Sequence, residues 1–192
     1  MKTTLLRIFL VICILPSLQG CPAILFTGAV ASATVVHDRR TAGTVLEDES
    51  IELKALQEIS ADEDLNKNTH CIIVSYNTVV LVTGEVPNQE MRNRVIELLR
   101  RIPKVSKLHD ELSIAAPSSV MSRSSDTVIT SKVKSRLLAS NEVKGLLIKV
   151  VTDKGVVYLM GMMKRGEADI ATDLTRTVSG VQKVVRLFEY ID

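Results

Sequence analysis

The stretch that decides the fold is an apolar run interrupted by one glycine, and it occurs twice. Residues 79–86 read Val-Val-Leu-Val-Thr-Gly-Glu-Val, and residues 156–163 read Val-Val-Tyr-Leu-Met-Gly-Met-Met, 77 positions later. A second match follows downstream, between Val-Ser-Lys-Leu at 105–108 and Val-Gln-Lys-Val at 181–184. Similarity at a fixed spacing indicates a repeated structural unit. The chain of 192 residues is therefore predicted to hold two copies of one small module.

Each copy has the pattern helix, strand, strand, helix, strand, which predicts an α+β fold. In the first copy an acidic stretch at 47–49 suits a helix N-terminus, and apolar residues with helical spacing follow at Ile51, Leu53, Leu56 and Ile59. The β-branched runs at 71–75 and 79–83 then predict a hairpin. Pro87-Asn88 opens a second helix that Pro103 ends, and residues 105–114 alternate as a last strand.

The second copy repeats this order. Asp126 is predicted to cap its first helix. The runs 146–151 and 156–160 flank a turn, residues 168–177 form a helix that Gly180 ends, and residues 181–191 form the last strand. The predicted boundaries are 47–115 and 125–192 for the modules, with a serine-rich linker at 116–124. Because each copy has fewer than about 70 residues and buries little core alone, we expect the two to pack together.

The N-terminus predicts an exported, lipid-anchored protein. A basic start with Lys2 and Arg7 precedes the apolar run 8–15, as in a secretory signal. The following Leu-Gln-Gly-Cys, at 18–21, resembles the lipobox of bacterial lipoproteins, in which the cysteine thiol receives a diacylglyceryl group and the freed amine is usually acylated after cleavage. We therefore predict a signal peptide at 1–20, lipidation at Cys21 and a tether at 21–46. The alternative is an uncleaved transmembrane helix, because no charged residue occurs between Ile8 and His37.

Composition and motifs argue against several functions. Without Lys2 and Arg7 the chain has 22 basic and 22 acidic residues, and only 3% of residues are aromatic, which does not favour nucleic-acid binding. No phosphate loop, catalytic triad, cofactor motif or metal-ligand cluster is recognisable, so we expect no enzyme, no cofactor and no metal. Cys71 beside His70 is expected to be a small core residue rather than a nucleophile, since neighbouring strand residues point to opposite faces.

Charge is unevenly divided between the two modules. Residues 47–114 contain 8 basic and 13 acidic residues, whereas residues 124–192 contain 11 basic and 8 acidic ones. If part of the chain meets an anionic surface, the second module is the one expected to do so.

The repeated strand-glycine pattern and the Gly-Val-Gln-Lys-Val at 180–184 resemble the BON domain family. The resemblance covers nearly the whole chain and is most specific over residues 126–138 and 157–161. Two such domains behind a lipobox resemble the dual-BON outer-membrane lipoproteins. The resemblance implies αββαβ modules with a mixed three-stranded sheet, a periplasm-facing role in outer-membrane integrity and cell division, and binding of anionic phospholipid through the first helix of the second module.

That helix carries the predicted site. Ile129, Val133 and Leu137 share one face, which is expected to contact the sheet. The predicted phospholipid-binding residues occupy the rest of the helix, flanked by Arg136: Val128, Ser131, Lys132, Lys134, Ser135 and Leu138. Aliphatic side chains there can insert among acyl chains while ammonium groups meet phosphates. Val128 stands where the resemblance implies a tryptophan, so binding relies more on charge. An ordinary solvated basic face is the alternative.

Two partners are therefore compatible with the sequence. One is an anionic phospholipid membrane, bound through the second module. The other is a protein of the outer-membrane assembly or peptidoglycan-remodelling machinery, contacted through a sheet edge or through the acidic first module. Nucleic acid is not an expected partner.

Overall fold

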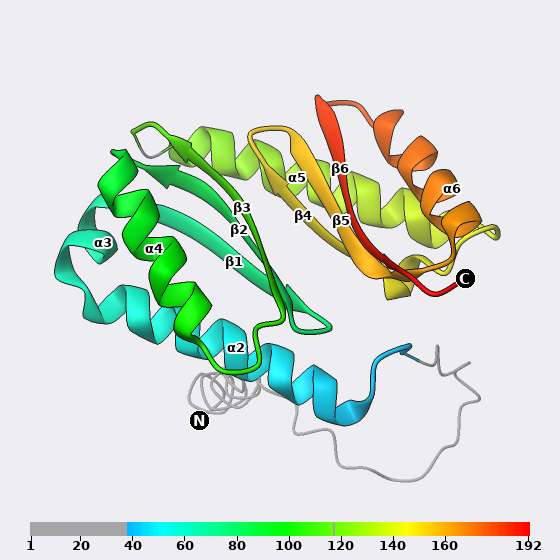
Figure 1. Cartoon of the computed structure of the whole chain (residues 1–192). Coiled ribbons are helices and arrows are strands. Elements are labelled where there is room, and N and C mark those ends of the chain that lie inside the picture. Colours follow the sequence, from blue (N-terminus) through cyan, green and yellow to red (C-terminus); the bar gives the residue numbers. More distant parts are fainter. Residues whose placement is uncertain (1–37, 117) are drawn as a thin grey trace, which may run out of the picture. The chain divides into compact units, whose positions relative to one another are not determined.

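Two copies of one unit make up the part of the chain that the computed structural model describes, residues 38–192 without residue 117 (Figure 1). The first module comprises α2 (Ala42–Ala61), α3 (Glu63–Asn68), β1 (His70–Tyr76), β2 (Val79–Val86), α4 (Gln89–Arg101) and β3 (Lys107–Ile114). The second comprises α5 (Val120–Ala139), a 3-10 turn (Gly145–Leu147), β4 (Lys149–Asp153), β5 (Val156–Met163), α6 (Arg165–Arg176) and β6 (Lys183–Tyr190).

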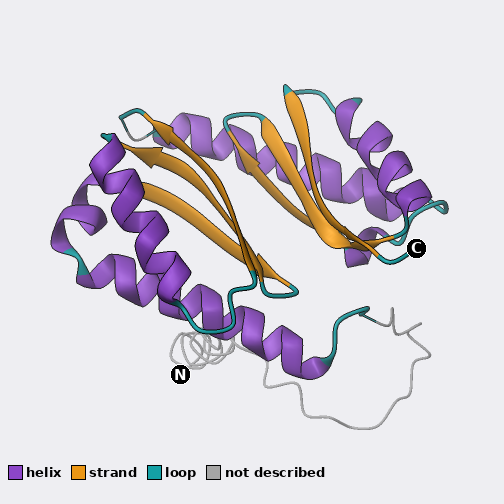
Figure 2. Cartoon of the chain, viewed as in Figure 1, coloured by secondary structure: helices purple, strands orange, loops and turns teal. Residues whose placement is uncertain are grey.

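Each module is a three-stranded mixed sheet with helices on one face (Figure 2). The strand orders are β1-β2-β3 and β4-β5-β6. In both sheets the hairpin strands pair antiparallel, while the central and last strands pair parallel. The central strands β2 and β5 are the repeated apolar stretches. The predicted α+β fold is confirmed, with the additional short helix α3 in the first module.

The central strands are apolar on both faces because both faces are covered. Along β2, Val80 and Val82 lie in the core under the module's own helices, whereas Leu81 belongs to a different cluster. In β5, Leu159 lies under the helices and Tyr158 points the other way. Successive strand residues face opposite sides of a sheet, so a strand buried on both sides is apolar throughout.

The cluster that contains Leu81 and Tyr158 joins the two modules. It combines residues of both sheets: Val74, Tyr76 and Leu81 from the first, and Val151, Tyr158 and Met160 from the second. The helix-free faces of the sheets therefore pack on each other, as expected from the small size of each module. The Thr83 hydroxyl also donates to Asp153 Oδ2 at 2.7 Å, across the same contact.

A buried carboxylate adds an ion pair to this contact. The side chain of Glu85, on β2, is fully buried, and its Oε1 lies 2.7 Å from Nζ of Lys154 in the β4–β5 turn. Burial raises the pKa of Glu85, but Lys154, the Ser118 backbone and His70 together outweigh that effect, and the pKa lies below its ordinary value. Glu85 is therefore ionised at neutral pH, and Lys154 compensates its charge.

Both long helices begin earlier than predicted. The first begins at Ala42 with Thr41 as N-cap, not at the acidic residues 47–49. The second begins at Val120 with Ser119 as N-cap, so part of the predicted linker is helical and Asp126 is not the cap. A serine or threonine hydroxyl satisfies a free backbone N–H group at each start. The prediction was wrong because acidic residues are typical of a helix N-terminus, whereas these lie inside the helices.

These acidic residues hold the hairpin turns instead. Asp48, on α2, accepts hydrogen bonds from the backbone N–H groups of Asn77 and Thr78, both at 2.8 Å. Asp126, on α5, accepts from the N–H groups of Lys154 and Gly155 at 2.9 and 2.8 Å. All four turn residues have positive φ, as in a two-residue hairpin turn. A buried aspartate thus fastens the helix to the hairpin in each module.

The glycine of the repeated stretch is required by close approach of the neighbouring backbone. Gly84 has φ of 123°, and a Cβ there would lie 1.9 Å from the His70 carbonyl oxygen. At the equivalent Gly161 a Cβ would lie 2.8 Å from the Leu147 carbonyl oxygen. A side chain at either position would displace the preceding strand or turn.

Two adjacent arginines in the predicted tether bind different modules. The Arg39 guanidinium donates to both carboxylate oxygens of Glu167, each at 2.8 Å, and to the Met162 carbonyl oxygen at 2.6 Å. The Arg40 guanidinium donates to Asp48 at 2.9 Å and lies 4.1 Å from the centre of the Tyr76 ring. The end of the predicted tether is therefore part of the folded structure.

Other predicted boundaries shift by a few residues. The hairpin strand predicted at 146–151 is β4 (Lys149–Asp153), preceded by the 3-10 turn. Leu53 and Leu56, predicted with Ile51 and Ile59 as one apolar stripe, are 56% and 62% exposed, and Ala55 joins the isoleucines in the core instead. The predicted signal peptide and Cys21 lie outside the described residues. Among the helices that the structure describes, none combines the length and apolar character needed to span a bilayer.

Candidate functional site

The helix α5 presents the predicted lipid-binding residues to solvent. Ile129, Val133 and Leu137 are at most 5% exposed and pack in the core of the second module, as predicted. The six predicted site residues are all exposed. Two of them are apolar, Val128 and Leu138, each 53% exposed. The helical periodicity therefore separates the two faces of α5 correctly, although exposure alone does not test lipid binding.

The six residues form two stripes rather than one patch. On the helical wheel Val128, Lys132 and Ser135 lie on one side of the line opposite the buried face. Ser131, Lys134 and Leu138 lie on the other side of that line, where two hollows lie along α5. Lys134 lines both hollows. The site is thus a pair of neighbouring stripes, of which the second borders the two hollows.

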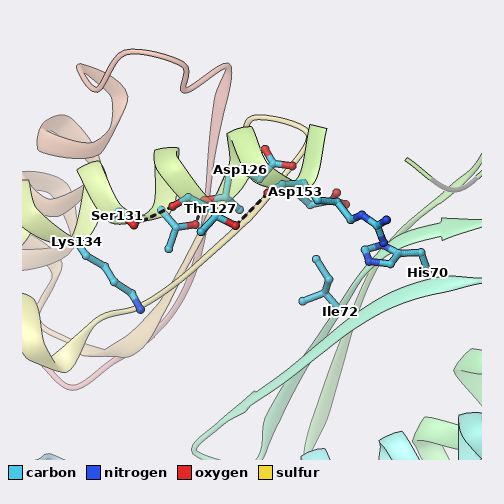
Figure 3. Close-up of a pocket in the computed structure, with 10 residues that line it drawn as sticks. His70, Ile72, Asp126, Thr127, Ser131, Lys134 and Asp153 are labelled. Atoms are coloured by element: carbon cyan, nitrogen blue, oxygen red, sulfur yellow. Dashed lines mark hydrogen bonds between the residues drawn. The ribbon is translucent and has the colours of Figure 1, made fainter. Parts of the chain in front are cut away.

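The larger hollow lies between α5 and the first module. Its volume is about 410 Å³, and it is bordered by Ser131 and Lys134 on α5 and by His70 and Ile72 on β1. Figure 3 shows these side chains on opposite walls, with Asp126 and Asp153 at the helix side. Asp126 accepts hydrogen bonds from the hairpin turn, and Asp153 accepts one from the Thr83 hydroxyl.

The smaller hollow reveals an apolar residue that sequence reasoning missed. It measures about 260 Å³ and is lined by Leu138, Leu146 and the cations Lys134 and Lys149, among others. Leu146 is 65% exposed. The sequence pattern placed Leu146 in a strand, whereas the structure places it in the 3-10 turn beside the end of α5. A Cβ at Gly145 would lie 2.6 Å from the Leu137 carbonyl, so this glycine allows the turn to approach the helix.

The charge of the exposed face of α5 is uniformly positive. Arg123, Lys132, Lys134 and Arg136 are exposed, and none forms an ion pair within the part of the chain that the structure describes. The single carboxylate of the helix, Asp126, is only 8% exposed. Unpaired cations around exposed aliphatic side chains can bind phosphate oxygens while the aliphatic groups enter an apolar layer.

The other candidate residues do not assemble a reactive site. Cys71 packs partly buried against the core, and burial raises the pKa of its thiol. His70 points the other way, with Nδ1 3.3 Å from Glu85 Oε2. Asp62, in the predicted solvated run 62–64, caps α3 by accepting from the Leu65 N–H group. Within the described residues no group of three or more potential ligands is placed to hold a metal ion.

This fold, with its duplicated αββαβ unit, defines a class of protein, and sequence comparison identifies it. The BON domain model matches residues 47–116 and 125–192. The chain belongs to the BON-domain family and carries two such domains. They are named the first and second BON domains below.

Three relatives match this chain over most of their length. The chain is 33% identical over 175 residues to the outer membrane lipoprotein DolP of Haemophilus influenzae, covering 91% of both chains. It is 33% identical over 154 residues to a 21 kDa hemolysin of Actinobacillus pleuropneumoniae, covering 80% of this chain and 79% of that protein. It is 28% identical over 161 residues to the osmotically inducible protein Y of Escherichia coli, covering 82% and 80%. The chain is thus a DolP-like dual-BON protein.

Proposed function

We propose that this protein is an outer-membrane lipoprotein, anchored through Cys21, whose second BON domain binds anionic phospholipid through α5. The lipobox-like Leu-Gln-Gly-Cys at 18–21 and the name of the 33% identical relative support the anchoring and the membrane. Such a protein faces the periplasm and supports envelope integrity where anionic lipid gathers, including the division site.

The observation that carries the lipid-binding proposal is the composition of the exposed face of α5. Val128 and Leu138 are each half exposed, and three cations surround them: Lys132, Lys134 and Arg136. Each cation near an anionic bilayer surface contributes about 1 kcal/mol. The apolar side chains add binding that does not depend on charge, and Leu146 extends the apolar part of the surface.

Vesicle binding tests this proposal. The variant Lys132→Glu, Lys134→Glu, Leu138→Glu is compared with the wild type, both with Cys21→Ser so that no acyl chain contributes. Sedimentation with vesicles of phosphatidylcholine, with and without phosphatidylglycerol, measures the affinity. The wild type should bind only the anionic vesicles, and the variant should lose at least about tenfold in affinity.

A matched control places the same chemical change on the first BON domain. Leu53→Glu, Lys54→Glu and Lys107→Glu change three exposed positions with the same change of charge. The control should bind vesicles as the wild type does. Equal binding by the α5 variant and the wild type would reject the proposed lipid site. In cells, a fluorescent fusion of the α5 variant should lose any accumulation at the division site.

The anchoring part has its own test. Mass spectrometry of the mature N-terminus should find an acylated Cys21 and no residues before it, and Cys21→Ser should leave the outer-membrane fraction. An uncleaved and unacylated N-terminus in the wild type would contradict the anchor while leaving the vesicle result intact.

A further inference from the structure

The outer face of α2, in the first BON domain, carries three exposed leucines in one stripe. Leu46, Leu53 and Leu56 are 66%, 56% and 62% exposed. With 3.6 residues per turn Leu46 and Leu53 fall opposite the buried Ile51, Ala55 and Ile59, and Leu56 falls on the adjoining flank. The stripe extends over ten positions, about 15 Å or nearly three turns. Exposed leucines scattered singly need no explanation, but a stripe of three along one helix does.

The duplicated fold offers an internal comparison for these positions. Both helices contain 20 residues, so α2 aligns with α5 without a gap, 78 positions apart. Their buried residues then coincide, from Asp48 with Asp126 to Ile59 with Leu137. The three leucine positions correspond to Ser124, Ser131 and Lys134. The same helix thus folds on the same sheet with polar residues there, so the leucines are not required by the fold.

The charge of α2 disfavours an anionic membrane as the partner of the leucines. The helix carries five carboxylates and one lysine. Glu49 lies beside Leu53 and Leu56 on the helical wheel, is exposed and forms no ion pair within residues 38–192, as far as these are described. An anionic lipid surface would repel this carboxylate by an amount similar to the attraction of a cation, about 1 kcal/mol. An apolar stripe on an acidic helix is complementary to an apolar stripe bordered by cations.

We propose that the outer face of α2 is a docking site for a basic amphipathic segment of another protein. The leucines would receive the apolar side chains of that segment, and Glu49 would pair with one of its lysine or arginine side chains. Recognition of an amphipathic helix by spaced apolar contacts is a common mode of peptide binding. The length of the stripe sets the length of the partner segment at about three helical turns.

A second copy of this chain is the alternative partner, and self-association of the protein distinguishes it from a different protein. The exposed face of α5 is itself basic and partly apolar, so α5 of one molecule has the chemistry to meet α2 of the next. Such a contact would be head-to-tail and would build open chains whose length grows with concentration. Sedimentation velocity of the Cys21→Ser protein over a range of concentrations measures this directly. Self-association that Leu46→Ser and Leu53→Ser remove would overturn the proposal in favour of a second copy.

Peptide binding tests the site itself. The probes are two synthetic amphipathic peptides of three helical turns, one of leucine and lysine and the other of leucine and glutamate. Isothermal titration to the full Cys21→Ser chain should show binding of the lysine peptide and none of the glutamate peptide. Amide chemical-shift changes should centre on α2. Shifts confined to other surfaces, or no binding of the lysine peptide, would overturn the proposal.

The variants use residues that this fold already accepts. Leu46→Ser and Leu53→Ser introduce the residues that α5 has at the same positions, so the fold is preserved. This double variant should bind the lysine peptide at least tenfold more weakly, and Glu49→Gln should also weaken binding, to a smaller extent. The matched control, Val128→Ser with Leu138→Ser on α5, should leave peptide binding unchanged. All α2 variants should bind anionic vesicles as the wild type does, so the peptide and lipid proposals fail independently.

Discussion

The helices α2 and α5 have the same inner face and opposite outer faces. Both bury an aspartate that holds the hairpin turn and three apolar residues that contact the sheet. Apart from the buried aspartates, α2 has four carboxylates and one lysine, whereas α5 has four cations and no carboxylate. The apolar positions also alternate: Val128 and Leu138 on α5 correspond to Ser50 and Ser60 on α2. Duplication preserved the residues that make the fold and left the outer face free to acquire different partners.

In a repeated fold, the residues that differ between the copies are the candidates for separate functions. Positions that are alike in both copies, such as Asp48 and Asp126, serve the common structure. Positions that differ in charge or polarity while the fold stays the same are not constrained by folding. By this criterion the cationic face of α5 and the leucine stripe of α2 are the two candidate binding surfaces. The following predictions test how far the two domains are equivalent.

The largest expected effect is on stability, at the buried aspartates. Asp48→Ala should lower the free energy of unfolding by about 3 kcal/mol, because it removes the acceptor of two turn N–H groups and of the Ser75 hydroxyl, and one of the two carboxylates paired with Arg40. Asp126→Ala loses two N–H contacts and should lower it by about 2 kcal/mol. Urea denaturation measures both. Equal losses would show that the additional partners of Asp48 contribute nothing.

The junction between the domains should contribute a slightly smaller amount. Lys154→Met leaves the Glu85 carboxylate buried without its cation, which should lower the free energy of unfolding by about 2 kcal/mol. The loss is smaller than for a fully buried pair because the Lys154 side chain is 39% exposed. The double variant Lys154→Met, Glu85→Gln should recover part of it in the same urea experiment. Failure to recover would mean that the Lys154 side chain stabilises the junction by packing rather than by charge.

Exchange of outer-face residues should affect lipid binding but not stability. Val128→Ser and Leu138→Ser give α5 the residues of α2 and should weaken binding to phosphatidylglycerol vesicles about tenfold, or about 1.4 kcal/mol, because the apolar contribution is lost. The reverse exchange, Ser50→Val with Ser60→Leu, should not create vesicle binding on α2 because its carboxylates remain. If that reverse exchange produced binding, apolar exposure alone would explain the lipid site.

The smallest expected effect is a pH dependence in the contact of Arg39 with the second BON domain. The Arg39 guanidinium lowers the pKa of Glu167 through its hydrogen bonds. This contact should therefore stabilise the fold fully above the ordinary glutamate pKa of about 4.3 and lose that contribution as the pH falls through the lower pKa of the folded state. Arg39→Ala should cost about 1 kcal/mol at pH 7 and less at acidic pH.

Thermal unfolding of the wild type and of Arg39→Ala at several pH values measures that dependence. Glu142→Gln, at an exposed position of the second BON domain, provides the control and should show no such difference. A difference between wild type and Arg39→Ala that stays constant down to strongly acidic pH would assign the effect to packing. Arg39 contacts Glu167 on α6, so this pH dependence is expected for the second BON domain and distinguishes it from the first.

Much of the fold was predictable because its signals are local. The duplicated strand with its glycine indicated two modules, and periodicity placed Ile129, Val133 and Leu137 on the buried face of α5. The residues predicted for the lipid site are exposed for the same reason. Leu53 and Leu56 were wrongly predicted to be buried because α2 has apolar residues on two of its faces. The small Ala55 lies on the face that is actually buried. The exposure of Leu146 was not predicted because the 3-10 turn that holds it forms through a tertiary contact with α5.

The sequence alone determined the two modules, the order of their elements and the outward face of α5, since repeats and hydrophobic periodicity depend on residues close together in the chain. Only the tertiary structure decided that the helix-free faces of the sheets pack together, that Asp48 and Asp126 hold turns, and that Arg39 binds Glu167, 128 positions away. Those contacts join residues that no local pattern connects, and their energies depend on burial and geometry that exist only once the chain has folded.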